Sequence, residues 1–589
     1  MQDCLAYAKH LLIYLCLSIF SGNTVAADNN FQLEIDSPSS VSELLNKHLS
    51  IVKSRDNPRT TATEWRRLYA ITPQEIQNLL ATEGYFSPQI LPAMSIQNGV
   101  SLAKFKVLLG APTKVNKIDI QFAGGITQPA THAPPSMQSL QENWALKQGE
   151  QFTQDAWDEA KRQLLVSLLI SRYPNAAISN SKATINPADS SASLLIEVDS
   201  GAPVQFGSLS IQGLERYPAS VVENLNPIKP GSEYNQSALL TFQSRLQESG
   251  YFSSVEVRAN TSATDDKGQR ITSAPILVTV KENQSIKLGL GAGFSTNTGA
   301  RTTATLSILN LFNRGWRMSN SLKVEQKAQS ISSQIRLPTT AEGYRDSLSA
   351  AVDHASIEGQ ATTSSKVGAK RAWGGRKREQ YVGANLLTEH VNLDGAPSSS
   401  NYSATIGYGI TLRRTDHDLS PTRGYLLNVQ FEGAPIEQLS SGRFLQTYLK
   451  GQTYYPITAS TQLIARAELG LVNGKNSAPA AFLFRAGGDQ SVRGYAYQSL
   501  GVEQGDAIVG GRYLVTGSLE MIQWLTPSWG AAVFFDFGDA ANTTQTLNPA
   551  TGYGLGARWK SPIGPIGADI AYGQRTDEYR MHFNIGVAF

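Results

Sequence analysis

The residues best suited to chemistry lie in one glycine-rich loop, GGDQSVRGY, at positions 487–495. Its arginine, Arg493, carries a planar fork of N–H donors that binds a carboxylate through two charge-assisted hydrogen bonds. A lone arginine in a loop is usually solvated, but here Val492 precedes it, and Gly494 and Tyr495 follow it. The stretch therefore predicts a loop anchored to an acidic side chain, which is recognition rather than catalysis.

Two acidic residues further along the chain are candidate partners for this arginine. In FFDFG, residues 534–538, both neighbours of Asp536 are apolar. Because successive side chains of a strand point to opposite faces, a strand that directs these neighbours outward directs Asp536 inward. Glu520, in GSLEMIQW, lies between two apolar residues and follows the same rule. Ordering a loop loses conformational entropy, and an ion pair offsets part of that loss. We expect Arg493 to bind Asp536, with Glu520 as the second candidate.

The inventory of catalytic motifs is thin. Six histidines follow residue 27, none in the H-E-x-x-H spacing of a zinc hydrolase. GLVNGKNS, residues 470–477, has glycines one residue too close for a phosphate-binding loop, and Asn476 replaces the required Ser or Thr. GLGAGF and GYGLG repeat glycine with period two, which is typical of strands rather than of a dinucleotide loop. We expect a protein that is not an enzyme and has no metal site, nucleotide or other cofactor.

The N-terminus predicts export. Residues 1–27 combine a basic pair, the apolar run LLIYLCLSIF and small residues, as in a secretory signal peptide cleaved near Ala26 or Ala27. Both cysteines, Cys4 and Cys16, lie within it, so we expect no thiol chemistry in the mature chain. The net charge of +3 is small and the basic residues are scattered, which argues against nucleic-acid binding. No later apolar run reaches the length of a spanning helix.

A unit recurs three times in the first half of the chain. GYFSPQI at 84–90 and GYFSSVEV at 250–257 are the clearest copies, with a degenerate SRYPNAAI at 171–178 between them. Each copy follows an amphipathic stretch that is predicted to be helical. We expect the first two of these helices to begin at caps formed by Thr72 and Thr153.

Each unit is expected to fold as strand, helix, helix, strand, strand. The predicted domains are a signal peptide at 1–27, repeats at 28–111, 112–202 and 203–283, and a different domain at 284–589. A simpler interpretation is that the three units are generic modules that act only as spacers. However, a three-stranded sheet leaves an exposed edge, which can accept an extended peptide as an added strand.

From about residue 284 the pattern changes to alternating strands without a convincing helix. In IKLGLGAGF, residues 286–294, and in MHFNIGVAF, residues 581–589, apolar residues share one face and small or polar residues the other. This pattern is typical of a transmembrane β-barrel, and the length allows about 16 antiparallel strands. A soluble sandwich or propeller is the alternative. The export signal, the absence of cysteines and the terminal aromatic residue weigh against it.

Three such units, a barrel and an SVRGY loop resemble the BamA/TamA superfamily of outer-membrane assembly barrels over nearly the whole mature chain. In that family the repeats are periplasmic POTRA domains, and the sixth extracellular loop docks its V-R-G-Y/F tip on lumen carboxylates. The resemblance implies this role for Val492–Tyr495, and a position in the outer membrane of a Gram-negative bacterium with POTRA domains in the periplasm. Three repeats before a 16-stranded barrel are most similar to the TamA branch.

The resemblance also implies a function and partners. We expect a TamA-like factor that inserts or secretes client proteins such as autotransporters, working with the outer-membrane bilayer and with an inner-membrane-anchored, TamB-like protein that binds the POTRA domains. Two alternatives stay open: a two-partner-type secretion pore for soluble proteins, and phospholipid transport between the membranes.

A mechanism follows from the strands expected to close the barrel. Glycine weakens a strand by roughly 0.5–1 kcal/mol per residue, so a glycine-rich first strand predicts a lateral seam that can open. An opened edge can pair with an incoming strand of a client protein. The predicted seam residues are Ile286, Leu288, Gly289, Leu290, Gly291, Gly293 and Phe294 on the first strand, and Met581, Phe583, Ile585, Gly586 and Phe589 on the last.

Overall fold

The structure is a computed structural model that describes residues 31–55, 57, 59–97, 100–128, 135–262, 272–474, 478–561 and 564–585. The predicted signal peptide and the last four residues of the predicted closing strand, 586–589, lie outside these ranges. The chain forms two compact units, and the third repeat contributes to both.

The first repeat is a three-stranded sheet covered by helices. Its elements are β1 (Phe31–Asp36), α2 (Ser39–His48), α3 (Ser50–Arg55), α4 (Ala62–Thr82), β2 (Gln89–Gln97) and β3 (Val100–Leu108). The sheet order is β1-β3-β2, with β3 parallel to β1 and antiparallel to β2. The core forms where the helices bury one apolar face against β3, for example Trp65 and Leu80 against Phe105.

The helix start predicted at Thr72 is wrong. Helix α4 begins at Ala62, and Thr61 is its cap, whose side chain accepts a hydrogen bond from the Glu64 N–H at 3.2 Å. Thr72 lies buried inside the helix, where its hydroxyl donates to the Leu68 carbonyl at 2.7 Å. The Thr-Pro pair suggested a start because proline suits a first helical turn. The buried face continues through both segments, and this favours one long helix.

The second repeat has the same topology. Its elements are β4 (Lys114–Ala123), η1 (Gly124–Thr127), α5 (Met137–Glu142), α6 (Gln154–Leu169), β5 (Ala177–Asn186) and β6 (Ser191–Asp199), with the sheet order β4-β6-β5. Helix α6 begins where predicted, since the Thr153 side chain accepts from the Ala156 N–H at 3.1 Å.

The degenerate middle copy of the repeated motif has a structural consequence. Gly84 and Gly250 end the preceding helices with φ of 86° and 76°, and Arg172 occupies the same place with φ of 59°. This conformation costs a non-glycine residue roughly 1–2 kcal/mol. Two backbone hydrogen bonds hold it: the Arg172 N–H donates to the Tyr234 carbonyl at 2.7 Å, and its carbonyl accepts from the Val204 N–H at 2.8 Å.

The third repeat again has a three-stranded sheet, in the order β7-β9-β8. Its elements are β7 (Gln205–Gln212), α7 (Ser220–Glu223), α8 (Gln236–Glu248), β8 (Phe252–Ala259) and β9 (Ser273–Glu282). Within the described residues, no helix of the chain is both long and apolar enough to span a membrane. At the end of β9, the buried Glu282 carboxylate accepts backbone N–H groups of Glu215 at 2.9 Å and Arg216 at 2.8 Å, and the Arg216 Nε–H at 2.6 Å.

This carboxylate predicts an acid-sensitive turn. Burial opposes its ionisation, but the donated N–H groups and the guanidinium outweigh burial and hold the pKa of Glu282 below its usual range. Its contribution to stability is therefore present above the unfolded pKa of about 4.3 and is lost as pH falls through the lower folded pKa. We expect amide exchange at 215–217, relative to intrinsic rates, to accelerate below about pH 4. In Glu282→Gln the turn should exchange faster at neutral pH, without that acid step; an unchanged profile in the variant would contradict this role.

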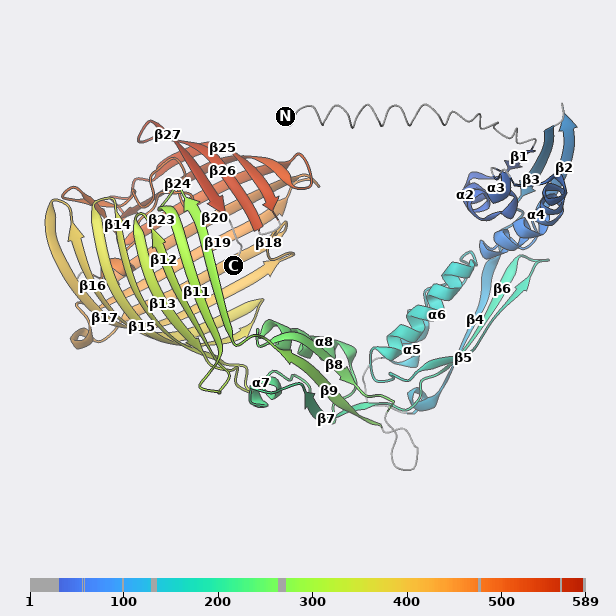
Figure 1. Ribbon diagram of the computed structural model, residues 1–589, viewed down its shortest axis with the longest axis horizontal. Helices are drawn as coiled ribbons and strands as arrows, with labels where there is room; N and C mark the ends of the chain where they lie inside the picture. Colours follow the sequence, from blue (N-terminus) through green and yellow to red (C-terminus); the bar gives the residue numbers. More distant parts are fainter. Residues whose placement is uncertain are drawn as a thin grey trace, which may run out of the picture. The chain divides into compact units, whose positions relative to one another are not determined.

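The rest of the chain forms one barrel of sixteen antiparallel strands, as predicted (Figure 1). The strands are β10 (Ile286–Ser295), β11 (Gly299–Leu311), β12 (Trp316–Glu325), β13 (Ala328–Arg336), β14 (Arg345–Ile357), β15 (Gln360–Gly375), β16 (Arg378–Leu393), β17 (Ala396–Thr415), β18 (Gly424–Ala434), β19 (Phe444–Pro456), β20 (Thr461–Gly474), β23 (Tyr513–Trp524), β24 (Trp529–Ala541), β25 (Ala550–Ser561), β26 (Gly564–Gly573) and β27 (Glu578–Ile585). Neighbours along the chain are neighbours in the sheet, except that the loop before β23 carries a small hairpin of its own.

Alternation along each strand separates the outer face of the barrel from the lumen. On β24, Val533, Phe535 and Phe537 are 38–45% exposed, whereas Asp536 is 0% exposed. A barrel-shaped sheet with an outward apolar band and a polar interior is the architecture of a transmembrane barrel. Carboxylates on the inner face are therefore available to whatever enters the lumen.

The two ends of the sheet are β10 and β27. Within the described residues, no ladder of backbone hydrogen bonds joins these strands. In the described part of the chain, a hydrogen bond lies across this seam: the Phe583 N–H of β27 donates to the hydroxyl of Thr296, the residue that follows β10, at 3.3 Å. Every other pair of adjacent strands shares a register of eight or more residues, so within the described residues β10 and β27 are the most weakly joined neighbouring strands.

Candidate functional site

The loop between β20 and β23, described from residue 478 to 512, is held against the barrel wall. The backbone N–H groups of Ala480 and Ala481 donate to the Glu389 carboxylate of β16 at 2.6 and 3.1 Å, and Arg485 donates to the Ile357 carbonyl of β14 at 3.1 Å. Apolar loop residues share a buried cluster with wall residues; from the loop these are Ala478, Phe482, Phe484, Ala486, Val492, Tyr495 and Leu500. The loop is thus ordered and packed against the barrel wall rather than exposed to solvent.

Arg493 is the most heavily bonded side chain of the loop. Its guanidinium binds Asp536 in bidentate fashion, with Nε to Oδ2 at 2.7 Å and Nη2 to Oδ1 at 2.9 Å. Its Nη1 donates to Glu520 at 2.7 Å and to Asp569 at 3.1 Å. The guanidinium lies 3.4 Å from the Phe534 ring centroid, and the residue is 2% exposed. Both carboxylates expected from alternation touch this arginine, and a third one joins them.

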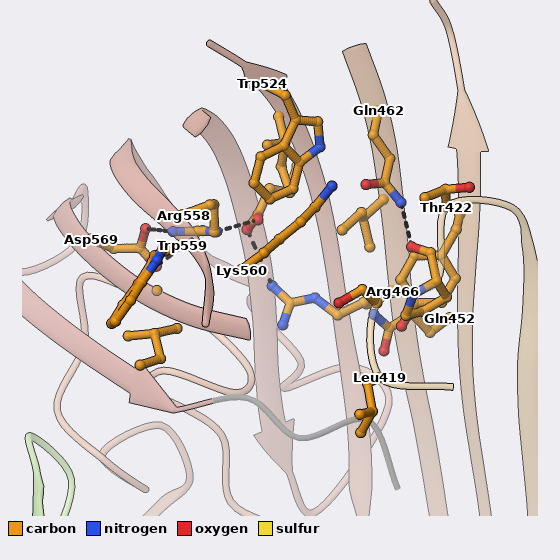
Figure 2. Close-up of a pocket in the computed structure, with 18 of the residues that line it drawn as sticks. Leu419, Thr422, Gln452, Gln462, Arg466, Trp524, Arg558, Trp559, Lys560 and Asp569 are labelled. Atoms are coloured by element: carbon orange, nitrogen blue, oxygen red, sulfur yellow. Dashed lines mark hydrogen bonds and ion pairs between the residues drawn. The ribbon is translucent and has the colours of Figure 1, made fainter. Parts of the chain in front are cut away.

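A second guanidinium, which the sequence reasoning did not find, completes the cluster. Arg558 of β25 donates to Glu520 through Nε at 2.8 Å and to Asp569 through Nη1 at 2.6 Å (Figure 2). The same alternation rule points to both new residues, because Arg558 and Asp569 each lie between two apolar neighbours in their strands. What distinguishes Arg558 and Asp569 is that they bind each other and the Arg493 cluster across neighbouring strands. The sequence of a single strand does not show such contacts.

The residues around Arg493 fix the backbone of the loop tip. Val492 is fully buried. Gly494 has φ of 96°, and its N–H donates to Nε2 of His582 on the last strand at 2.9 Å. The Tyr495 hydroxyl donates to the Thr551 carbonyl at 2.8 Å. His582 was assigned to the inward face of the last strand but was not predicted as a contact of the loop.

Glycines of β25 provide the space into which the tip fits. A Cβ on Gly552 would lie 1.9 Å from the Arg493 carbonyl oxygen, so no other residue leaves this oxygen in place. A Cβ on Gly554 would lie 2.1 Å from the Ile570 carbonyl oxygen of β26 and 2.7 Å from the Phe534 ring. The period-two glycines of GYGLG therefore mark a close backbone approach, which is one of the reasons for glycine in strands.

Gly552→Ala is expected to displace the loop tip and destabilise the barrel by roughly 1–3 kcal/mol, as overpacking does. Gly375→Ala on β15 is the matched control, because a Cβ there meets nothing within 4 Å. Thermal unfolding in detergent, followed by the heat-modifiable gel mobility of barrels, measures both. Equal midpoints for the two variants would contradict the close approach.

The predicted seam residues separate cleanly by face on β10. Ile286, Leu288, Leu290 and Phe294 are 57–79% exposed on the outer surface. The three glycines of β10 face inward, each beside the side chain of its registered partner on β11. The pairs are Gly289 with Thr305, Gly291 with Thr303 and Gly293 with Arg301. On β27, Met581 and Phe583 are exposed and Ile585 is the final strand residue, whereas Gly586 and Phe589 lie outside the described residues.

Comparisons with known proteins agree with this architecture. A family model described as the Omp85 superfamily domain matches residues 231–589. The outer membrane protein assembly factor BamA of Nitratidesulfovibrio vulgaris is 26% identical over 408 residues, 64% of this chain and 49% of the relative. BamA of Neisseria meningitidis serogroup B is 24% identical over 506 residues, 71% of this chain and 61% of the relative. This chain thus spans between about half and three fifths of the length of these two curated relatives.

A solved structure shows the same fold. BamA from Haemophilus ducreyi lacking POTRA domains 1-3 superposes with a TM-score of 0.66 at 16% identity, over 81% of this chain and 100% of that one. At this identity the likeness concerns the fold: α+β repeats followed by a sixteen-stranded barrel.

Proposed function

Because this chain belongs to the Omp85 superfamily, we propose that it assembles client proteins into the outer membrane by strand addition at the seam between β10 and β27. The barrel lies in the outer membrane, with the POTRA-type repeats in the periplasm, as predicted. The relatives that the chain matches are named as assembly factors. The step from family to activity is our inference from the seam.

The unpaired seam is the observation that carries the proposal. A free strand edge presents a row of N–H and C=O groups that pair readily with another strand. In this barrel the edge of β10 carries outward Leu288 and Leu290 at 70% and 79% exposure, and no ladder satisfies its groups within the described residues. A client strand that pairs with β10 would form hydrogen bonds with these backbone groups without breaking those that already join two strands.

The periplasmic repeats supply further strand edges. In the first sheet, β2 is an edge strand on which Leu91 and Ile96 are 55% and 69% exposed. We propose that such edges hold client segments on their way to the seam, and that the first repeat binds a TamB-like partner. Three repeats before sixteen strands support placing the chain in the TamA branch, with autotransporter-type clients.

A secretion conduit for soluble proteins is less well supported. Its lumen must open, and here the loop that carries Arg493 is held within the barrel by bonds to β14, β16, β24 and β25. Opening the lumen means extracting a buried guanidinium from three carboxylates, whereas no backbone ladder has to be broken to separate β10 from β27 in the described part of the chain. The chemistry requires no nucleotide or cofactor on either route.

Site-specific photo-crosslinking tests the proposal. A photoreactive residue is placed in turn at 286–294 in living cells during synthesis of an autotransporter. We expect crosslinks to the client, strongest at alternate positions, because outward and inward side chains alternate along β10. Crosslinks that reach only β27 of the same chain would reject seam insertion and favour phospholipid transport between the membranes.

A further inference from the structure

We infer that the lumen holds a binding site for the head group of an anionic amphiphile, formed by Arg466, Lys560 and Trp524. The site is a cavity of about 250 Å³ beneath the tip of the docked loop (Figure 2). This inference goes beyond client insertion and does not depend on which proteins are clients.

The cavity is lined by cationic side chains that its carboxylates do not bind closely. Glu520 already accepts Arg493 at 2.7 Å and Arg558 at 2.8 Å, so Arg466 reaches it only at 3.9 Å. The firm partner of Arg466 is a neutral group, the Ser518 hydroxyl at 3.0 Å. The guanidinium of Arg466 thus faces the cavity without a carboxylate at hydrogen-bonding distance.

Lys560 is the second available cation. Its Nζ lies 3.8 Å from the centroid of the Trp524 ring, and Figure 2 shows the side chain extended alongside that ring. Within the described residues, no carboxylate lies within 4 Å of this ammonium group. Two other acidic residues line the cavity: Asp569 accepts from Arg558 at 2.6 Å and from Arg493 at 3.1 Å, and Asp489 accepts a hydrogen bond from the Asn297 amide at 2.6 Å. Two cations that have no carboxylate at hydrogen-bonding distance in the described residues therefore line one cavity.

The remaining walls are largely apolar. Leu419 and Pro421 come from the turn between β17 and β18, which is tied to the wall because Gln462 Nε2 donates to the Pro421 carbonyl at 2.8 Å. Ile464 and Ile522 continue this surface. A lining that combines cations with apolar groups suits an anion that carries an apolar body. The volume is just below the roughly 300 Å³ at which sites for drug-sized ligands begin, so it suits a head group rather than a whole lipid.

A peptide fits this site less well than a lipid head. The strands that line the cavity are β19, β20, β23, β25 and β26, and each of them pairs with a neighbour on both sides. Their backbone groups are already used, so a peptide backbone would be left without partners inside the cavity. A phosphate diester has no N–H groups to satisfy and accepts hydrogen bonds from both cations.

Calorimetric titration of the purified full chain with soluble dihexanoylphosphatidylglycerol, below its micelle concentration, tests the site. We expect saturable binding that is about tenfold weaker in Lys560→Gln and in Arg466→Gln, since each loses one charge-assisted hydrogen bond. Lys450→Gln is the matched control: this lysine pairs with Glu468 at 2.7 Å and does not line the cavity, so affinity should be unchanged. Heat-modifiable gel mobility verifies that each variant is folded.

Competitors identify the ligand class. Inorganic phosphate should displace the lipid only weakly, and the zwitterionic dihexanoylphosphatidylcholine should bind more weakly than the glycerol lipid. Equal potency of phosphate, equal affinity of the choline lipid, or unchanged binding in both variants would overturn the proposal. Tighter, Lys560-dependent binding of a peptide with a free C-terminal carboxylate would also overturn it and assign the cavity to a polypeptide.

Discussion

Arg493→Ala is expected to destabilise the barrel by roughly 3–5 kcal/mol and to abolish assembly, because it leaves carboxylates buried without their cation. Asp536 is 0% exposed and receives three of the arginine's hydrogen bonds, including one from the Arg493 backbone N–H at 3.1 Å. The carboxylates of Glu520 and Asp569 keep Arg558 as a partner, so the loss falls mainly on Asp536. Denaturant unfolding in detergent measures the change, and limited proteolysis reports release of the loop.

Three further variants separate docking from general damage. Arg493→Lys keeps the charge but cannot bind in bidentate fashion, so it should fall between wild type and the alanine variant. The double variant Arg493→Ala/Asp536→Ala should recover part of the lost stability, because no unpaired Asp536 charge remains. Arg378→Ala removes an exposed arginine whose side chain makes only a 3.4 Å bond to Gln380, and it should be neutral. Wild-type stability and protease resistance of Arg493→Ala would refute the docking role.

The second large effect concerns the seam. Linking Thr296→Cys to Phe583→Cys with a short thiol crosslinker is expected to reduce client insertion roughly tenfold or more, since the open state is then no longer populated. These positions are chosen because the Phe583 N–H already touches the Thr296 hydroxyl. Both natural cysteines lie within residues 1–27, the predicted signal peptide, so we expect no competing thiol once this segment is cleaved. A cleavable crosslinker should restore insertion when it is cut.

A crosslink between two strands that are already joined by backbone hydrogen bonds provides the matched control. Val367 and Leu386 are registered partners on β15 and β16, and both are exposed on the outer face. Crosslinked cysteines at these positions join strands that stay paired in any case, so insertion should continue at the wild-type rate. If the seam crosslink were equally harmless, lateral opening would not be part of the mechanism.

The sequence by itself determined the features that depend on local periodicity. Alternation assigned Asp536 and Glu520 to the lumen, because successive side chains on a strand point to opposite faces. The repeated GYF motif indicated three units, and the alternating pattern after residue 284 indicated about sixteen strands. Each of these inferences requires only neighbours in the chain.

Local signals failed where two of them competed. Thr72 before Pro73 resembled a helix cap, but the cap at Thr61 prevails because the buried face of α4 continues through both segments. Whether a helix ends or continues depends on the surface that it packs against, and this surface belongs to the tertiary structure.

Only the tertiary structure decided which residues meet. Asp569, Arg558 and His582 come from three strands, and Arg493 comes from a loop that precedes them all. Alternation places each one on the inner face but gives no register across strands, and register decides which inward groups lie within bonding distance. The glycines of β10 predicted a weak seam, but the lack of a ladder between β10 and β27 in the described residues is a property of strand pairing that their sequences could not show. Pairing across strands is a property of the closed barrel, and it is there that the candidate site is assembled.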